Sequence, residues 1–274
     1  MTIDRREGLS YREFEREYML PLRPVIVTDA TRGWTALGKW TPEFFGEHYG
    51  TVPICIDGRS TRLADLIERI LASTPDEPAP YLRNQLLSQW PDELRADVTP
   101  LPIYTQPNWL ESPLLGPHRS LSAFEIYIGG RGARFPTLHY DGLHSHAFLM
   151  EIYGKKEFWC YSPEQAPLMY PRGGIGNLSA VNDVEHPDLE RFPLFAKAVC
   201  EKFALGPGEM LFVPAGWWHT TRLLGPAISV SVSCANATNW KDFARDYGMG
   251  LGGKYGRVVG LAATTYLNLL GRLL

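Results

Sequence analysis

The sequence has few features of a secreted, membrane-spanning or nucleic-acid-binding protein. Its four cysteines are scattered without a CxxC pair, which argues against a zinc ribbon or a disulfide-stapled secreted domain. The formal net charge of −3 offers no broad attraction to nucleic acid or anionic membranes, so nucleic-acid substrates are disfavoured. The charged N-terminal segment contains no apolar signal sequence. We therefore expect a cytoplasmic protein.

Long apolar runs are also missing. The longest apolar segment, residues 258–274, is shorter than the ~20 residues of a membrane-spanning helix, and it is interrupted by Gly260, Asn268, Gly271 and Arg272. Hydrophobic residues make up 45% of the chain and charged residues 21%, which is ordinary for a globular protein with a sizeable core. These values predict a folded protein without a membrane span.

The first third of the chain has helical patterns around one short strand. Residues 8–22 are predicted to be helical, and the β-branched residues within 23–29 predict a buried strand. Thr41 followed by Pro42 is typical of a helix start, with Thr as the cap and Pro at the first helical position. A further helix is expected from Ser60 to Ala72.

From about residue 120 the sequence changes to short aromatic or β-branched runs separated by glycine and proline turns. Many short strands at such spacing favour an all-β sandwich or barrel. The runs are AFEIYIGG, HAFLMEIYG, KKEFWCYSP, GEMLFVPAG and AISVSVSC. After Asn239 the pattern is helical again. We predict one domain over residues 1–240, which includes an N-terminal helical layer, and a helical tail over residues 241–274.

A histidine and a carboxylate lie two positions apart in an extended segment. Side chains at positions i and i+2 of a strand share a face, so His139 and Asp141 should converge. His219 follows a predicted strand and a Pro-Gly turn and is the candidate third ligand. Two histidines and one carboxylate form the facial triad of non-haem iron(II) oxygenases, which leaves coordination positions for a chelating 2-oxo acid and dioxygen.

Other interpretations of these histidines remain open. An HxD pair alone also occurs as a hydrogen-bonded pair at a barrel rim, and the addition of His219 in a β-rich context is what favours a metal site. His144 and His146 form an HxH pattern that would converge on a strand. They either bind a second metal or, more commonly for such residues, hydrogen-bond within the pocket or shape the substrate entrance.

Four segments resemble cupin-like JmjC proteins, among them the asparaginyl hydroxylase that acts on hypoxia-inducible factor and its bacterial homologues. The segments are RPVIVTDA, WTPEFFGEHYG, FPTLHYDGLHSHAFLMEIYGKKEFWCYSPEQ and GPGEMLFVPAGWWHTTRLL. The resemblance runs from about residue 20 to 240. It implies a mainly β fold, the double-stranded β-helix or cupin/JmjC jelly roll, with N-terminal helices and a helical C-terminal tail. It also implies Fe(II) as cofactor and 2-oxoglutarate as cosubstrate.

The resemblance also implies a cosubstrate site. In the family's iron enzymes, a basic residue two positions after the glycine of a KG- or YG-type turn binds the distal carboxylate of 2-oxoglutarate, and Lys156 occupies that position. Its neighbour Lys155 should face solvent. A tyrosine ahead of the barrel adds a hydroxyl, a role that falls to Tyr81. Relatives often carry threonine three residues before the first ligand, where this chain has Pro136, so Thr137 is the expected third contact.

We accordingly expect an Fe(II)- and 2-oxoglutarate-dependent dioxygenase, most simply a hydroxylase of a protein or peptide side chain or of a small molecule. One alternative is an N-methyl demethylase with the same centre, although the sequence contains no reader domain or zinc cluster typical of histone demethylases. Another is a non-catalytic metal-binding cupin module. The substrate itself is not identified by the sequence.

The predicted C-terminal helix has a broad apolar stripe. Its members recur at helical spacing and are Val259, Ala262, Ala263, Tyr266, Leu267 and Leu270. The stripe either packs on the barrel or pairs with another chain, as the C-terminal helices of the resembling hydroxylase do. We expect a homodimer.

Overall fold

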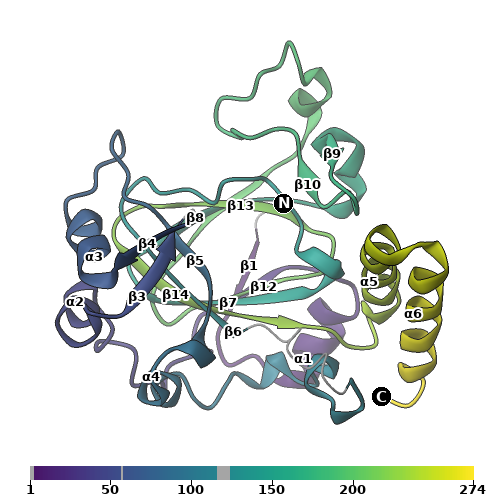
Figure 1. Cartoon of the computed structure of the whole chain (residues 1–274), viewed down its shortest axis with the longest axis horizontal. Helices are drawn as coiled ribbons and strands as arrows, with labels where there is room; N and C mark the ends of the chain where they lie inside the picture. Colours follow the sequence, from purple (N-terminus) through teal and green to yellow (C-terminus); the bar gives the residue numbers. More distant parts are fainter. Residues whose placement is uncertain (1–2, 57, 116–123) are drawn as a thin grey trace.

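The computed structural model describes residues 3–56, 58–115 and 124–274. A seven-stranded sheet, in the order β1-β2-β12-β7-β14-β6-β5, and a three-stranded sheet, β11-β8-β13, form the centre of the molecule (Figure 1). All neighbouring strands in these two sheets are antiparallel except β1 and β2, which are parallel. The mainly β fold with N-terminal and C-terminal helices that the sequence predicted is confirmed.

The strands are short, as the spacing of turns in the sequence indicated. They are β1 (Asp4–Arg6), β2 (Val25–Val27), β3 (Pro53–Ile56), β4 (Arg59–Arg62), β5 (Leu82–Leu86), β6 (Phe124–Gly129), β7 (His146–Tyr153), β8 (Lys156–Tyr161), β9 (Pro171–Arg172), β10 (Leu178–Ser179), β11 (Glu201–Leu205), β12 (Met210–Val213), β13 (Trp218–Leu223) and β14 (Ala227–Cys234). Two further two-stranded sheets, β3-β4 and β9-β10, lie outside the two central ones.

Helices lie at both ends of the chain and in the connections. The α-helices are α1 (Tyr11–Phe14), α2 (Pro42–Tyr49), α3 (Leu63–Leu71), α4 (Asp92–Asp97), α5 (Trp240–Tyr255) and α6 (Arg257–Leu270), and η1 (Glu15–Met19) is a π-helical turn. Short 3-10 helices are η2 (Leu87–Gln89), η3 (Ile103–Thr105), η4 (Trp109–Glu111), η6 (Gly142–His144), η7 (Pro163–Met169) and η8 (Pro193–Lys197).

The two faces of β14 have different neighbours. Ile228, Val230 and Val232 belong to the main apolar core, which also contains buried side chains of α1, α2 and α3. The intervening Ser229 and Ser231 are buried as well (1% and 7% exposed), on the face toward the interior of the barrel. The alternation of apolar residues and serine therefore separates the core from an internal cavity, and neither face meets solvent.

The N-terminal helical layer has the expected helices, but they are shorter than predicted. The helix expected over residues 8–22 covers residues 11–19, as α1 and η1. Thr41 caps α2, because its hydroxyl accepts a hydrogen bond from the Phe44 amide at 3.1 Å. The helix predicted from Ser60 begins instead at Leu63. Residues 59–62 form β4, whose pairing with β3 outweighs the helical pattern that follows.

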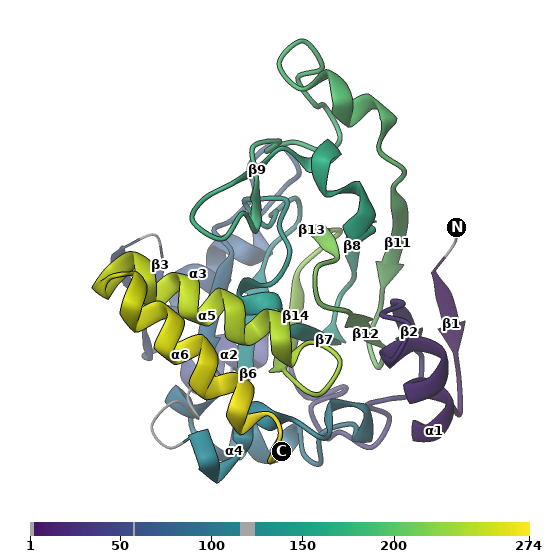
Figure 2. The same ribbon diagram turned by 90° about the vertical axis from the view of Figure 1, so that its right-hand side faces the viewer.

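Helices α5 and α6 form a hairpin against one side of the molecule (yellow in Figure 2). Gly256 separates them with a φ of 99°, a conformation that favours glycine. Leu267 and Leu270 pack in a core with Trp240 and Phe243. Val259 and Tyr266 of the expected stripe are exposed (44% and 56%), so only part of it packs on the protein. Among the described residues, no helix combines the length and apolar character that crossing a membrane requires.

Candidate active site

His139 and His219 are held together by their main chains. The His139 amide donates to the His219 carbonyl at 3.0 Å, and the His219 amide donates to the His139 carbonyl at 2.6 Å. His219 belongs to β13, whereas His139 forms an isolated β-bridge with it. The ring centroids lie 4.5 Å apart. Backbone pairing therefore fixes the spacing of the two imidazoles.

The same nitrogen of each ring is already engaged. Nδ1 of His139 lies 3.0 Å from the Thr137 carbonyl, and Nδ1 of His219 lies 3.0 Å from the Trp217 carbonyl. A carbonyl oxygen accepts a hydrogen bond from a protonated Nδ1, and this tautomer leaves the lone pair on Nε2 for a metal. Burial, with a further contribution from the neighbouring His219, lowers the pKa of His139 to about 3. That imidazole is therefore neutral at physiological pH, as metal binding requires.

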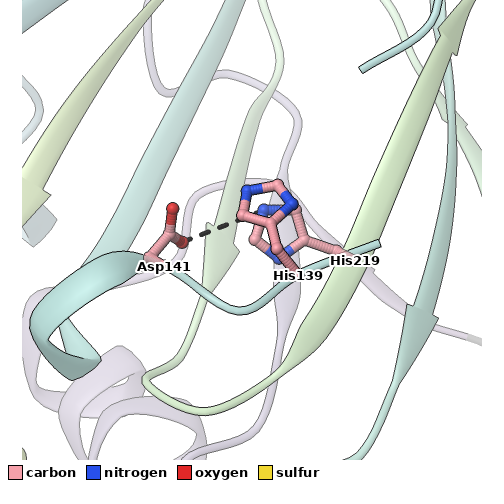
Figure 3. A group of neighbouring side chains, drawn as sticks. All are labelled: His139, Asp141 and His219. Atoms are coloured by element: carbon pink, nitrogen blue, oxygen red, sulfur yellow. Dashed lines mark ion pairs between the residues drawn. The ribbon is translucent and has the colours of Figure 1, made fainter. Parts of the chain in front are cut away.

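Asp141 completes the cluster. It precedes η6, and its Oδ2 lies 3.9 Å from His219 Nε2 (dashed line in Figure 3). Candidate ligand atoms of the three side chains all lie within 4.8 Å of one another. The Asp141 Oδ2 is buried without a hydrogen-bond partner in the described part of the chain. Burial raises the pKa of this carboxyl group, an effect partly opposed by His219. An unpartnered buried carboxylate beside two imidazoles fits a divalent metal ion.

A cavity of about 200 Å³ adjoins this cluster. It is lined by the three candidate ligands together with Tyr81, Asn84, Glu125, Tyr127, Phe135, Gly142, Ala147, Leu149, Lys156, Phe158, Thr220, Thr221 and Ser231. Most of these come from the interior faces of β6, β7, β8, β13 and β14. The cavity is mostly apolar with a few polar groups, the usual composition of a small-molecule site.

Lys156 is the single lysine or arginine among the residues that line the cavity. Its side chain is almost completely buried (1% exposed), and its ammonium donates to the Ser229 hydroxyl. Nζ lies 5.6 Å from the centre of the Tyr81 ring and 5.4 Å from that of Tyr127. The adjacent Lys155 lies in the connection between β7 and β8 and is exposed. Two of the expected cosubstrate contacts, Lys156 and Tyr81, thus lie together in the cavity.

The third expected contact is placed differently. Thr137 is not among the residues that line the cavity, and its main-chain carbonyl instead faces the His139 ring. Thr220 and Thr221 line the cavity from β13, and the Thr221 hydroxyl is buried without a partner in the described residues. The threonine side chains at the cavity therefore belong to the strand of His219, not to the segment before His139.

Sequence reasoning missed two cavity residues on β6. Glu125 and Tyr127 alternate along this strand and face the cavity, and the Tyr127 hydroxyl donates to Glu125 Oε2 at 2.5 Å. They stand opposite Ser231 and Ser229 of β14 in the strand pairing. Burial raises the pKa of Glu125, and the nearby Asp141 raises it further. The alternation of polar and apolar residues along β6 and β14 was the sequence signal that could have identified these cavity residues.

His144 and His146 do not join the metal-ligand cluster, which is the one such group found among the described residues. His146 is completely buried; its Nδ1 accepts from the Ala215 amide at 3.0 Å and its Nε2 lies 2.8 Å from the Thr238 hydroxyl. His144 Nδ1 lies 2.5 Å from Asp246 Oδ2 on α5. Both side chains hold the turn after Asp141 to the rest of the fold, and the second-metal interpretation gains no support.

Comparison with known proteins agrees with this architecture. The model of the cupin-like domain family matches residues 11–234. The chain belongs to this family, and the cupin-like JmjC resemblance is confirmed.

Several curated proteins are similar over most of the chain. Lysine-specific demethylase 8 of Xenopus tropicalis is 33% identical over 238 residues, which cover 81% of this chain and 50% of that protein. Arginine-specific demethylase JMJ20 of Arabidopsis thaliana is 28% identical over 286 residues, covering 88% and 60%. HSPB1-associated protein 1 of Homo sapiens is 32% identical over 134 residues, covering 48% and 26%.

The chain thus spans about half the length of the curated relatives it matches first. Two of these three relatives are named as demethylases and none as an asparaginyl hydroxylase, so the more specific resemblance to that hydroxylase is not supported.

Proposed function

We propose that the protein is an Fe(II)- and 2-oxoglutarate-dependent oxygenase. The observation that carries this proposal is the cluster of His139, Asp141 and His219 at the wall of a cavity that also contains a buried lysine. The two Nε2 atoms and the Asp141 carboxylate would hold the metal on one face. Iron in such a site would bind and activate dioxygen, and oxidative decarboxylation of the 2-oxo acid would supply the electrons for that activation.

The residues of the chain position the cosubstrate in this proposal. Lys156 would pair with the distal carboxylate of 2-oxoglutarate, and Tyr81 and Thr221 line the same cavity with hydroxyl groups. A charge-assisted hydrogen bond to a buried ammonium is strong because little water competes for it. The apolar side chains of Leu149 and Phe158 line the same cavity and would exclude water from the space around Lys156 and the bound carboxylate. Thr137 stays a prediction with no support from its position.

We infer a cationic side chain of a protein as the substrate. The relatives' names specify lysine and arginine, and Glu125 and Asp141 give one part of the cavity two carboxylates. A carboxylate that remains after metal binding would attract an ammonium or guanidinium group. Glu125 is the candidate for this role because Asp141 is occupied as a ligand. A small-molecule substrate is the less supported alternative.

Hydroxylation and demethylation differ only in the carbon that is oxidised. Oxygen inserted at a chain carbon stays in the product as an alcohol. Oxygen inserted at an N-methyl carbon gives a hydroxymethylamine, which breaks down to formaldehyde and the free amine. The relatives' names favour demethylation over hydroxylation as the final outcome.

Mass spectrometry of peptides distinguishes these outcomes. The purified protein with Fe(II), ascorbate and 2-oxoglutarate is incubated with peptides that carry plain or methylated lysine and arginine. Gain of one oxygen atom indicates hydroxylation, and loss of a methylene unit with formaldehyde release indicates demethylation. An Asp141→Ala variant controls for non-enzymatic oxidation. If neither product forms and 2-oxoglutarate is not consumed, the oxygenase proposal fails, and a non-catalytic metal-binding module becomes the better interpretation.

We also propose that the protein is cytoplasmic and that two chains associate through α6. The exposed face of α6 carries the apolar side chains of Val258, Leu261, Tyr266 and Leu269, and Leu273 just after the helix is exposed as well. Analytical ultracentrifugation of the wild type and of Leu261→Glu would show a dimer converted to a monomer. A wild type that is monomeric throughout the micromolar range would contradict the association.

A further inference from the structure

Glu151 is a second carboxylate in contact with Lys156. It lies on β7, is completely buried (0% exposed), and places Oε2 3.8 Å from Lys156 Nζ. Neither of its carboxylate oxygens has a hydrogen-bond partner in the described part of the chain. Glu151 is not among the residues that line the cavity, whereas Lys156 is. Lys156 therefore contacts the cavity and a hidden carboxylate at the same time.

Few other ionisable groups surround this pair. The remaining polar side chains packed near it are Ser229 of β14, Tyr81 before β5, Tyr127 of β6 and, acting on Tyr81, Arg83 of β5. The neighbouring strand β12 has no ionisable residue, and the side chain of Glu209, just before it, pairs with Arg5. Lys156 is the one cation identified as acting directly on Glu151.

One buried ammonium cannot neutralise two carboxylates. If Glu151 is ionised, the pair is neutral, and an incoming carboxylate meets a buried negative charge at short range. If Glu151 is protonated, the positive charge of Lys156 is available to the cavity. Burial raises the pKa of Glu151 to about 8, although Lys156 opposes the shift. At neutral pH the protonated form therefore predominates.

We propose that Glu151 must carry a proton for Lys156 to hold the distal carboxylate of a dicarboxylate cosubstrate, so that binding takes up one proton wherever free Glu151 is ionised. This inference rests on the proposed function, since it concerns the same cosubstrate site. It makes Glu151 a positioning residue that acts through Lys156 and does not touch the ligand. Cosubstrate affinity should be constant below pH 8 and fall about tenfold per pH unit above it.

Calorimetry on the metal-loaded protein tests the proton uptake directly. 2-Oxoglutarate is titrated anaerobically into the Mn(II)-loaded wild type between about pH 6.5 and 9.5, in two buffers that differ in ionisation enthalpy. The wild type should take up about one proton per ligand at the alkaline end. Its dissociation constant for 2-oxoglutarate should rise about tenfold per pH unit above pH 8. Glu151→Gln should bind with constant affinity and take up none. The matched control is Glu157→Gln, which changes the residue next to Lys156 on the opposite, partly exposed face and should behave as wild type.

A ligand without the distal carboxylate separates this effect from titration at the metal. Pyruvate retains the 2-oxo acid group, so its binding should show no difference between wild type and Glu151→Gln. If 2-oxoglutarate binds with parallel pH profiles in both proteins, the inference is wrong while the proposed function stands. If neither the wild type nor Glu151→Gln binds 2-oxoglutarate at any pH, the proposed function fails, and the inference fails with it.

Infrared difference spectroscopy tests the proposal on the wild type alone, so it does not require that Glu151→Gln folds. The wild type should show a buried carboxylic-acid carbonyl band at neutral pH that disappears above about pH 8 and returns when 2-oxoglutarate is added at that pH. A band that is absent at neutral pH, or that does not return with the ligand, would overturn the proposal.

Discussion

The main chains of His139 and His219 exchange two hydrogen bonds, at 3.0 Å and 2.6 Å, across a single β-bridge. The two imidazoles that would bind the metal are therefore positioned by backbone pairing and do not depend on a flexible loop. Preorganisation of this kind reduces the cost of assembling a metal site. Asp141 lies outside this bridge, just before the turn that His144 connects to Asp246 of α5.

Removal of one ligand should abolish metal binding without unfolding the chain. His139→Ala and Asp141→Ala each leave two ligands, so Fe(II) affinity should fall by more than the ~100-fold typical of changes to outer-sphere partners. The backbone bridge remains in the His139 variant, so the thermal unfolding temperature should change little. Anaerobic titration with Fe(II) and 2-oxoglutarate, followed through the visible charge-transfer band of the chelate, measures the loss. His186→Ala, at an exposed histidine, is the control, and binding retained in Asp141→Ala would refute the ligand assignment.

Lys156→Met should weaken 2-oxoglutarate binding by roughly 10- to 100-fold, because a charge-assisted hydrogen bond contributes about 1.5–3 kcal/mol. Metal affinity should be unchanged, since Lys156 is not a ligand. Lys155→Met changes an exposed neighbour and serves as the matched control. Isothermal titration of the Mn(II)-loaded variants measures both constants. Equal 2-oxoglutarate affinity in the two variants would remove Lys156 from the cosubstrate site.

The sequence predicted the residues whose positions follow from strand periodicity. His139 and Asp141 converge, and Lys156 is buried while Lys155 is exposed, as alternation along an extended chain predicts, although Lys155 and Asp141 lie just outside the strands. Thr137 was assigned by motif position alone, and the structure instead brings Thr221 to the cavity from a strand far away in the sequence.

Features that depend on pairing between distant strands could not be predicted from the sequence. Glu151 looked like an ordinary polar residue on a strand, and only the packing of β7 against β8 and β14 shows that it is buried beside Lys156. The start of α3 was wrong for a different reason, since residues 59–62 pair with β3, the strand just before them in the sequence. The Asp57-Gly58 dipeptide between the two strands is a local hairpin signal that the helical interpretation overlooked.

Acid should destabilise the fold through His146. Burial lowers its pKa to about 3 from an ordinary value of 6.5, so the ring is neutral in the folded protein and takes up a proton only on unfolding. Because the unfolded chain binds the extra proton, the free energy of unfolding should fall as pH decreases from about 6.5 toward 3, by at most about 1.4 kcal/mol per pH unit from this residue.

Urea unfolding of the metal-free protein across this pH range checks the contribution. His146→Asn keeps an acceptor for the Ala215 amide but cannot titrate, so its stability should depend less steeply on pH, by about one proton. His186→Asn, at an exposed position, should follow the wild-type slope. Parallel slopes for wild type and His146→Asn would show that His146 does not titrate as its burial indicates.

Glu125→Gln should weaken the binding of a cationic substrate and leave the cosubstrate unaffected. The substitution keeps the shape of the side chain and an acceptor for the Tyr127 hydroxyl but removes the charge that faces the cavity. Loss of one partly buried ion pair should raise KM for a lysine or arginine peptide by roughly 10-fold or more. Because the reacting carbon is held by other contacts as well, kcat should change less than KM. A substrate with a neutral side chain would bind Glu125→Gln at least as well as wild type. Steady-state kinetics on both proteins therefore decides whether the Glu125 carboxylate recognises a cation.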